Sequence, residues 1–364
     1  MILFDLVVNV LALSCRSHLV SGKVLKYGTP GSVGMISWSF VQLEKKISAH
    51  LIPENYSSAT YNEIHPVYPG ATVMIGYQST IVSHFAVGEV IRYANENGSE
   101  LENLEKISAK LGTIYDLVAS LSKLFTTILA LQQLERGAIG LDCTVSTYIP
   151  NLLASGQDVT ILQLLTHTAG FDADPAPPLW TGYASYNARR QAIITQGLMT
   201  MQIVLEIVTG LTFGTLLERD FTGPLRISDI FFNPGNLALD TSRIAATEFQ
   251  AAPVWGTVHD ENAWSLDGVF STAKDMGFFC VRILKPQSVD KIFTDYNTAF
   301  PVHEHGLTAR HMGFTGTSMV INRPSNTSMI LLTNRVHPSR NWSSPNIARQ
   351  MVGYWVRKAL GFNE

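Results

Sequence analysis

The sequence predicts an α/β protein in which both ends of the chain contribute strands to one sheet and a helical region is inserted between them. β-rich runs occur near residues 70–92 and again at 317–333, whereas the apolar residues between these runs recur at helical spacing. The chain has 364 residues, of which 46% are hydrophobic. A chain of this length can bury about three quarters of its unfolded surface, so a substantial core is available.

The first strands are predicted at residues 70–92, as a hairpin around a turn at 76–79. The polar residues 93–113 then form a surface connection. From Ser120 to Arg136 apolar residues recur every three or four positions, which predicts a helix that ends before Gly137.

Further helices are predicted at residues 160–166 and 199–208, with a proline-rich surface loop at 172–178 between them. Two strands follow at 317–322 and 329–333. A last helix is predicted to begin with Ser344 as N-cap and Pro345 at its first position, and it carries Ile347, Met351, Tyr354 and Trp355.

Composition excludes several classes of protein. Lys and Arg number 26 and Asp and Glu 29, a net charge of -3, so no basic excess is available to bind nucleic acid. The glycine and proline contents are ordinary. The cysteines have neither the number of a disulfide scaffold nor the spacing of a zinc site; they are Cys15, Cys143 and Cys280.

The N-terminal residues 1–15 are apolar, but they lack a basic start and are interrupted by Asp5 and Asn9. They are shorter than the roughly 20 apolar residues that span a bilayer, and no later segment is long enough to do so. We expect a buried strand or helix here. Four Asn-x-Ser sequons do not establish secretion; they lie at Asn55, Asn97, Asn326 and Asn341. The compartment is left open, with an intracellular location favoured.

A Ser-x-x-Lys quartet places a hydroxyl and an amine one helical turn apart, so that a neutral lysine can accept the serine proton. Three quartets occur, where chance gives roughly one or two; they are Ser120/Lys123, Ser271/Lys274 and Ser288/Lys291. The second is interpreted as a helix cap and the third as an exposed helix start. Only Ser120 lies at the start of the most apolar helix of the chain, where a polar pair needs either hydrogen-bond partners or a role in the chemistry. The alternative for this pair is a capping serine and a solvated lysine.

Other motifs point away from metal and cofactor chemistry. His303 and His305 lack a third ligand at suitable spacing and are interpreted as loop residues. The sequence contains no His-Glu-x-x-His, P-loop, dinucleotide fingerprint or Gly-x-Ser-x-Gly elbow. We expect neither a metal nor an organic cofactor.

Several segments together resemble the serine β-lactamase and penicillin-binding-protein superfamily, in particular its class-C-like esterase and transesterase branch. The segments, in chain order, are 119–127, 164–171, 258–263, 270–276, 311–318 and 331–340. The resemblance implies a β-lactamase/transpeptidase-like fold: an antiparallel sheet flanked by helices, with an all-helical region at about 120–250. It implies a catalytic domain at 65–360, preceded by an N-terminal extension at 1–64 with the first elements.

The resemblance also implies roles for individual residues. Ser120 would be the acylated nucleophile and Lys123 its base. The backbone N–H groups of Ser120 and Phe314 would form the oxyanion hole. Gly313 would allow close approach of substrate, and His311 would line the wall of the site.

Two kinds of departure from the family pattern are present. The tyrosine of the second motif is missing, because Ile193 and Thr195 occupy its positions and Tyr186 has the wrong spacing. The chain also looks shortened after Val269, Leu284 and Leu307. These losses fit a degenerate homologue, or a sequence from which coding segments are missing.

The sequence therefore predicts a serine acyl-transfer enzyme, an esterase or transesterase acting on a small-molecule ester or acyl substrate. The alternative is a catalytically impaired homologue that binds a small molecule or a partner. Neither the identity of the substrate nor the oligomeric state follows from the sequence.

Overall fold

The structure is a computed structural model of the whole chain. It describes residues 25–56, 64–116, 121–150, 158–170, 200–232, 240–248, 268–278, 284, 286–294, 308–340 and 345–362. The predictions for residues 1–15, for the loop at 172–178 and for Ser344 lie outside these ranges.

The predicted hairpin is confirmed. Strands β2 (Gly70–Tyr77) and β3 (Thr80–Ile91) pair antiparallel, and Gln78 and Ser79 turn the chain with φ of 47° and 68°. Two consecutive residues with positive φ match the twist of the flanking strands, which is why short hairpin turns use this conformation.

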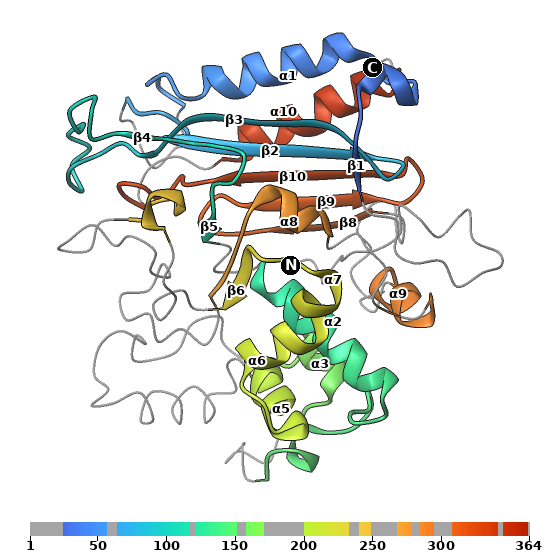
Figure 1. The fold of residues 1–364 in the computed structure, drawn as a ribbon. Coiled ribbons are helices and arrows are strands. Elements are labelled where there is room, and N and C mark those ends of the chain that lie inside the picture. Colours follow the sequence, from blue (N-terminus) through green and yellow to red (C-terminus); the bar gives the residue numbers. More distant parts are fainter. Residues whose placement is uncertain are drawn as a thin grey trace.

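One sheet joins the two ends of the chain, as predicted (Figure 1). Its order is β1 (Lys26–Tyr27), β3, β2, β10 (Thr327–Thr333), β9 (Ser318–Asn322) and β8 (Thr308–Met312), and β4 (Ile107–Ser108) pairs with β3. Strand β10 pairs with β2 from Thr327 opposite Tyr77 to Thr333 opposite Ala71. The expectation of an antiparallel sheet is wrong at one edge, because β1 runs parallel to β3. A long connection through a helix separates these strands, and such a connection permits parallel pairing.

Two helices cover one face of the sheet: α1 (Ser37–Ala49) and α10 (Asn346–Ala359) (Figure 1). Helix α1, from the predicted N-terminal extension, shares its core with β2, β3 and α10. Helix α10 begins one residue later than predicted, with Pro345 as its N-cap. The buried residues of this helix are Ala348, Val352, Val356 and Ala359. The larger apolar residues named in the sequence analysis are exposed or only partly buried; they are Ile347, Met351, Tyr354 and Trp355.

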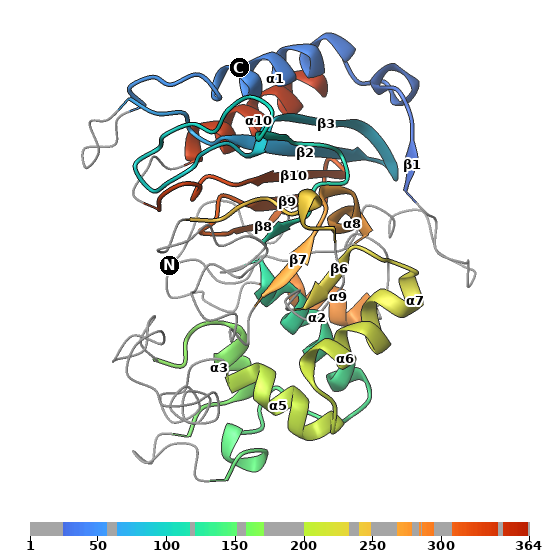
Figure 2. The ribbon, with the colours of Figure 1, turned by 60° about the vertical axis from the view of Figure 1, so that its left-hand side comes forward.

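The opposite face carries the helical region (Figures 1 and 2). Its main helices are α2 (Ser122–Glu135), α3 (Ile161–Leu165), α5 (Thr200–Thr209) and α6 (Phe213–Leu217). A small sheet lies beside them, in the order β5 (Tyr115–Asp116), β7 (Val269–Ser271), β6 (Ile230–Phe232). The shorter elements are η1 (Pro30–Val33), η2 (Val145–Thr147), the π-helix η3 (Glu218–Thr222), α7 (Gly223–Leu225), η5 (Thr241–Arg243), α8 (Ala273–Phe278) and α9 (Pro286–Ile292).

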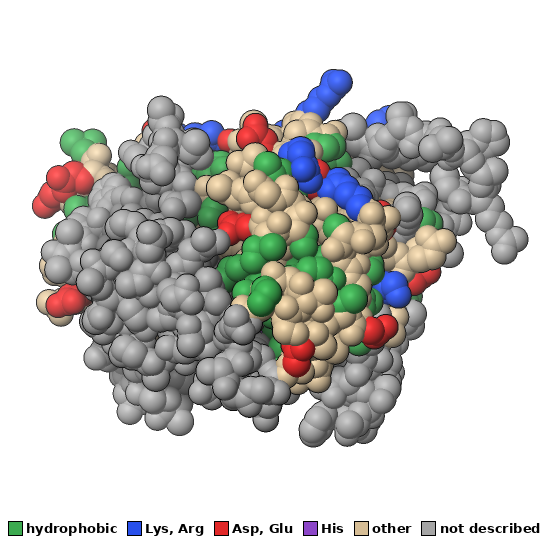
Figure 3. All heavy atoms as spheres, turned by 90° about the horizontal axis from the view of Figure 1, so that it is seen from below, with side chains coloured by type: hydrophobic (Ala, Val, Ile, Leu, Met, Phe, Trp, Pro, Cys, Tyr) green, Lys and Arg blue, Asp and Glu red, His purple; other side chains and the backbone are tan. Residues whose placement is uncertain are grey.

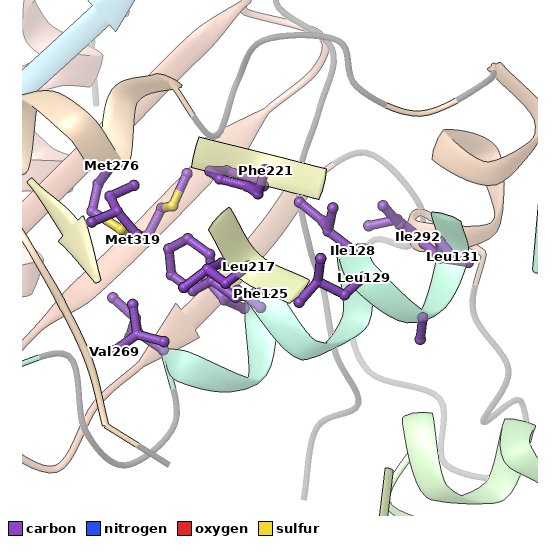
Figure 4. Packing of buried hydrophobic residues seen from close by; sticks show 14 of the residues in the cluster. Phe125, Ile128, Leu129, Leu131, Leu217, Phe221, Val269, Met276, Ile292 and Met319 are labelled. Carbon is purple, nitrogen blue, oxygen red and sulfur yellow. The ribbon is translucent and has the colours of Figure 1, made fainter. Parts of the chain in front are cut away.

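Helix α2 is fixed by an apolar core. Phe125, Ile128 and Leu129 are fully buried and pack toward Leu217 and Phe221 (Figure 4). The rings of Phe125 and Phe221 meet edge to face, with centroids 5.3 Å apart, a favourable geometry for aromatic pairs. The chain leaves α2 through Gly137, whose φ of +74° ends the helix where the sequence predicts.

The other two serines in Ser-x-x-Lys quartets have structural roles. Thr272 caps α8, since its Oγ1 accepts the N–H of Asp275 at 3.1 Å, which confirms the capping interpretation for Ser271/Lys274. The third quartet is placed differently from the prediction. Helix α9 begins at Pro286, so Ser288 lies inside it and is buried, whereas Lys291 is exposed.

No single helix among the described residues is long and apolar enough to cross a membrane, although α5 and the helix at Phe213–Leu225, bent by 76°, pass that test as a pair.

Seen from below, hydrophobic side chains gather in the middle of the described surface, and Lys and Arg are interspersed with Asp and Glu around them (Figure 3).

Asp220 links the C-terminal end of α2 to the π-helix η3 by hydrogen bonds. Its carboxylate is 4% exposed and accepts hydrogen bonds from Arg136, Arg219 and Gln133. Burial raises the pKa of Asp220, but the hydrogen bonds and charges of both arginines outweigh burial and hold it well below its usual range. Substitution leaves two cations without their anion. We expect Asp220→Ala to lower the free energy of unfolding by about 3 kcal/mol, measured by urea denaturation.

The control for this prediction is Asp290→Ala. Asp290 is 66% exposed and lies 3.5 Å from Arg323, so its removal should cost less than about 1 kcal/mol. Equal losses for the two variants would contradict the role assigned to the buried carboxylate.

The ring of His337 forms hydrogen bonds with two other segments of the chain, and its shifted pKa leads us to expect that stability depends on pH. Its Nε2 accepts the N–H groups of Arg92 and Tyr93 at 3.3 and 3.2 Å, and Nδ1 donates to the carbonyl of Thr247 at 3.1 Å. This arrangement requires a neutral ring. Burial lowers the pKa of His337 to about 4, against an ordinary value of 6.5.

A folded-state pKa below the unfolded value stabilises the protein above pH 6.5, and this contribution is lost as the pH falls toward 4. The shift corresponds to about 3 kcal/mol. We expect the unfolding free energy of the wild type to fall more steeply between pH 6.5 and 4 than that of His337→Asn. Identical pH profiles would show that His337 does not carry this dependence.

Candidate active site

The start of helix α2 is fixed by contacts with the small sheet. Ser120 lies outside the described residues, but Leu121 is the N-cap of α2 and is fully buried. The hydroxyl of Ser122 accepts the N–H of Val269, the first residue of β7, at 3.2 Å. Lys123 is half-buried in the first turn. The start of α2, which follows Ser120 in the sequence and carries Lys123, is therefore fixed against the small sheet.

Strand β8 presents the third predicted motif toward the same region. Side chains alternate along a strand, so His311 and Gly313 share a face with Ala309. Ala309 is buried in the core to which α2 contributes. A Cβ added to Gly313 would lie 3.6 Å from Cδ1 of Leu121. The structure thus brings Gly313 of the third motif close to Leu121, the residue that follows Ser120 in the sequence.

A tight turn follows Gly313 and joins β8 to β9. The N–H of Gly313 donates to the carbonyl of Thr317 at 2.7 Å, and the N–H of Gly316 donates to the carbonyl of Gly313 at 3.2 Å. Gly316 has a φ of +101°, and a Cβ there would meet Thr333 and Arg335. Only glycine fits this position. Phe314 is 43% exposed at the tip of the turn.

Side chains beneath the turn bind its carbonyl groups. Arg349 donates from Nη2 to the carbonyls of Gly313 and Thr317, both at 3.0 Å. Arg335 donates from Nε to the carbonyl of Phe314 at 3.0 Å, and its guanidinium lies 4.6 Å from the centre of the Phe314 ring. Burial, and then the positive charge of Arg335, lower the pKa of Arg349 to about 10. Both side chains therefore remain cations at neutral pH.

The electrostatic surroundings of Lys123 include His167, from the segment at 164–171. His167 has a φ of +52° in the loop after α3. Although His167 as a residue is exposed, partial desolvation lowers the pKa of its ring, and the positive charge of Lys123 lowers it further. His167 is therefore neutral at neutral pH, so the ring adds no second positive charge near Lys123.

Some predicted positions cannot be placed, and some contacts were not predicted. His303, His305, Tyr186, Ile193 and Thr195 lie outside the described residues. Sequence reasoning missed three polar residues that the structure places at the site: His167, Arg335 and Arg349. A charged residue on the flank of an amphipathic helix is ordinarily solvated, so Arg349 gave no signal. Within the described ranges, no group of three or more His, Cys, Asp or Glu side chains could hold a metal ion.

Gly313 offers a direct test of how tightly this strand end is packed. A Cβ at this position would lie 2.2 Å from Oγ1 of Thr317, so Gly313→Ala must displace the Thr317 side chain or the turn that carries it. We expect the rate of acylation by an activated ester to fall by about 10²-fold, as small misplacements at reacting groups do. Thr317→Ala in the same chain should recover part of the loss. Wild-type rates for Gly313→Ala alone would contradict the close packing.

Comparisons with known proteins find similar sequences and similar folds. The family model for beta-lactamase matches residues 69–350. A protein of Escherichia coli strain K12, which carries the name "Putative D-alanyl-D-alanine carboxypeptidase", is 26% identical over an alignment that covers 91% of this chain and 90% of that protein. That alignment spans 411 positions, so about 80 of them face no residue of this 364-residue chain.

Solved structures share the fold. EstCE1, described as a hydrolase with promiscuous acyltransferase activity, superposes with a TM-score of 0.61 at 18% identity, over 86% of this chain and 98% of that one. Simvastatin synthase LovD from Aspergillus terreus superposes with a TM-score of 0.59 at 17% identity, over 88% and 98% of the two chains.

Proposed function

Because the chain belongs to the beta-lactamase family, we propose that it is a serine acyl-transfer enzyme, an esterase or transesterase that works through an acyl-enzyme on Ser120. One observation carries the proposal: Gly313, the residue after β8, lies so close to Leu121, the residue after Ser120, that an added Cβ would be 3.6 Å from Leu121 Cδ1. This proximity supports a site in which the hydroxyl of Ser120 would attack a carbonyl group whose oxygen accepts hydrogen bonds from the N–H groups of Ser120 and Phe314.

In the proposed reaction the Oγ of Ser120 attacks the carbonyl carbon of an ester, and its proton passes to the amine nitrogen of Lys123. The carbonyl π electrons move to oxygen, and backbone N–H groups stabilise the resulting oxyanion, each worth about 3 kcal/mol. Collapse of the intermediate breaks the bond to the alkoxide leaving group, which takes the proton from Lys123. Water or a second alcohol then attacks the acyl-enzyme by the reverse sequence, and releases a carboxylic acid or a new ester.

Ester chemistry fits this chain better than peptide cleavage. An amine leaving group is strongly basic and needs a proton donor, whereas an alkoxide from an activated ester leaves with less help. The family tyrosine that would assist is absent from its expected positions. The likeness in fold to EstCE1, a hydrolase that also transfers acyl groups, is consistent with this preference.

The test is covalent labelling of the purified protein. Incubation with p-nitrophenyl butyrate, followed by acid quenching, should add one butyryl group to the chain, and peptide mapping should place it on Ser120. The matching p-nitroanilide should label far more slowly. Absence of label on Ser120, with butyrate production no faster than in buffer, would overturn the proposal.

A second candidate function is binding without turnover through the same site. The absent tyrosine favours it, as do the roughly 80 alignment positions without a counterpart here. Sequencing the transcript across codons 198–199, 269–270 and 307–308 separates the explanations. Additional coding segments at these junctions would restore the family length and favour the enzyme, whereas an unbroken reading would favour a shortened homologue.

A further inference from the structure

The peptide unit between Gly313 and Phe314 has one end held by a side chain from another element. The carbonyl of Gly313 accepts a hydrogen bond from Nη2 of Arg349 at 3.0 Å. In a planar trans peptide the C=O and N–H groups point in opposite directions. The position of the Gly313 carbonyl therefore fixes the direction of the Phe314 N–H, the predicted oxyanion donor.

Arg349 is itself held in place. Its Nη2 also donates to the carbonyl of Thr317 at 3.0 Å, and its Nη1 donates to Oδ1 of Asn346 at 2.8 Å. A planar guanidinium with several fixed partners positions an acceptor more sharply than a single flexible donor. Arg349 comes from α10, on the face of the sheet opposite to α2 (Figures 1 and 2).

We propose that Arg349 is a positioning residue for acyl transfer: by holding the carbonyl of Gly313 from the side of α10, it directs the N–H of Phe314 toward the start of α2. The inference rests on the proposed function, because an oxyanion forms only if a carbonyl is attacked at Ser120. Arg349 acts through the backbone of the turn and touches neither substrate nor reacting atoms.

Arg335 restrains the next peptide unit. Its bond to the carbonyl of Phe314 and its position against the Phe314 ring limit rotation on that side, and Thr333 donates to the carbonyl of Gly316 at 3.1 Å. The carbonyls of Gly313, Phe314, Gly316 and Thr317 thus all accept bonds from side chains. Two cations side by side are costly to bury, and here both are used to orient the backbone of one turn.

The experiment compares Arg349→Met with the wild type and with Arg357→Met, a matched control at an exposed position on the same helix. The readout is single-turnover acylation by p-nitrophenyl butyrate, with maximal rate and half-saturating ester concentration determined separately. We expect Arg349→Met to lower the maximal rate by about 10- to 100-fold, since loss of one oxyanion donor costs about 10²- to 10³-fold. Half-saturation should change by less than about twofold.

Two further readouts separate positioning from a general loss of structure. Free guanidinium chloride, at concentrations that leave the wild type unaffected, should restore part of the rate of Arg349→Ala. If Arg349→Met does not fold, the variant Asn346→Ala tests the positioning role of Arg349 instead. Asn346 is exposed, and its loss loosens the guanidinium without removing it, so we expect a rate about threefold lower at unchanged half-saturation.

The outcomes distinguish the two proposals. A wild type that is not acylated at Ser120 overturns the proposed function, and this inference with it. A wild type that is acylated, together with a folded Arg349→Met of wild-type rate, overturns the role of Arg349 and leaves the function standing. If only Asn346→Ala is folded, a wild-type rate in that variant counts against the positioning role.

Discussion

Replacing Ser120 with alanine is expected to abolish acylation and to lower ester turnover by at least about 10³-fold. The Ser120 hydroxyl is the only group of the protein that bonds to the acyl carbon in the proposed reaction, and its loss removes the covalent route entirely. Turnover of p-nitrophenyl butyrate and intact-protein mass after quenching measure the two effects.

The chain supplies matched controls in its other Ser-x-x-Lys quartets. Ser271 is buried and donates to the carbonyl of Thr272, and Ser288 is buried inside α9. Ser271→Ala and Ser288→Ala should both retain label and turnover. A label that survives in Ser120→Ala, or disappears in Ser288→Ala, would place the nucleophile elsewhere.

Replacing Lys123 with methionine is expected to lower the rate of acylation by about 10²- to 10⁴-fold, the usual worth of a positioned proton acceptor. Methionine keeps most of the length and apolar contact of the side chain and removes the amine. Stopped-flow release of p-nitrophenol gives the acylation rate, and the half-saturating concentration should stay near that of the wild type because the lysine acts on the transition state.

Lys274→Met and Lys291→Met are the controls here, since both lysines are exposed and belong to quartets with structural serines. Neither change should affect acylation. A Lys123→Met protein with the wild-type rate would show that another group accepts the serine proton. The next residue to substitute would then be His167, because the charge of Lys123 lowers its pKa.

Local patterns predicted the regular elements well. The hairpin of β2 and β3, the helices α2 and α5 and the strands β9 and β10 each carry their own periodicity and turn residues. Short strands escaped prediction, because β1 and β5 have two residues each and β6 and β7 three. A period of two cannot be recognised over so few residues, and these strands exist only because a partner strand binds them.

Helix α10 shows the limit of periodicity within a correctly predicted element. Its larger apolar residues include Ile347 and Tyr354, and each is 39% exposed, whereas small residues such as Ala348 and Ala359 are buried. Close packing of α10 against α1 and the sheet favours small side chains at the contact. Size and hydropathy alone therefore do not tell which side of the helix is buried.

The sequence by itself determined where the longer strands and helices form and which family pattern the chain follows, because each of these depends on residues close together in the chain or on motifs in order. Only the tertiary structure decided that Gly313 lies near Leu121, that β1 joins the sheet in parallel, and that Arg335 and Arg349 hold the turn at residues 313–317. These contacts join segments far apart in the chain, and they form because burying one shared core forces distant backbone groups to find their hydrogen-bond partners there.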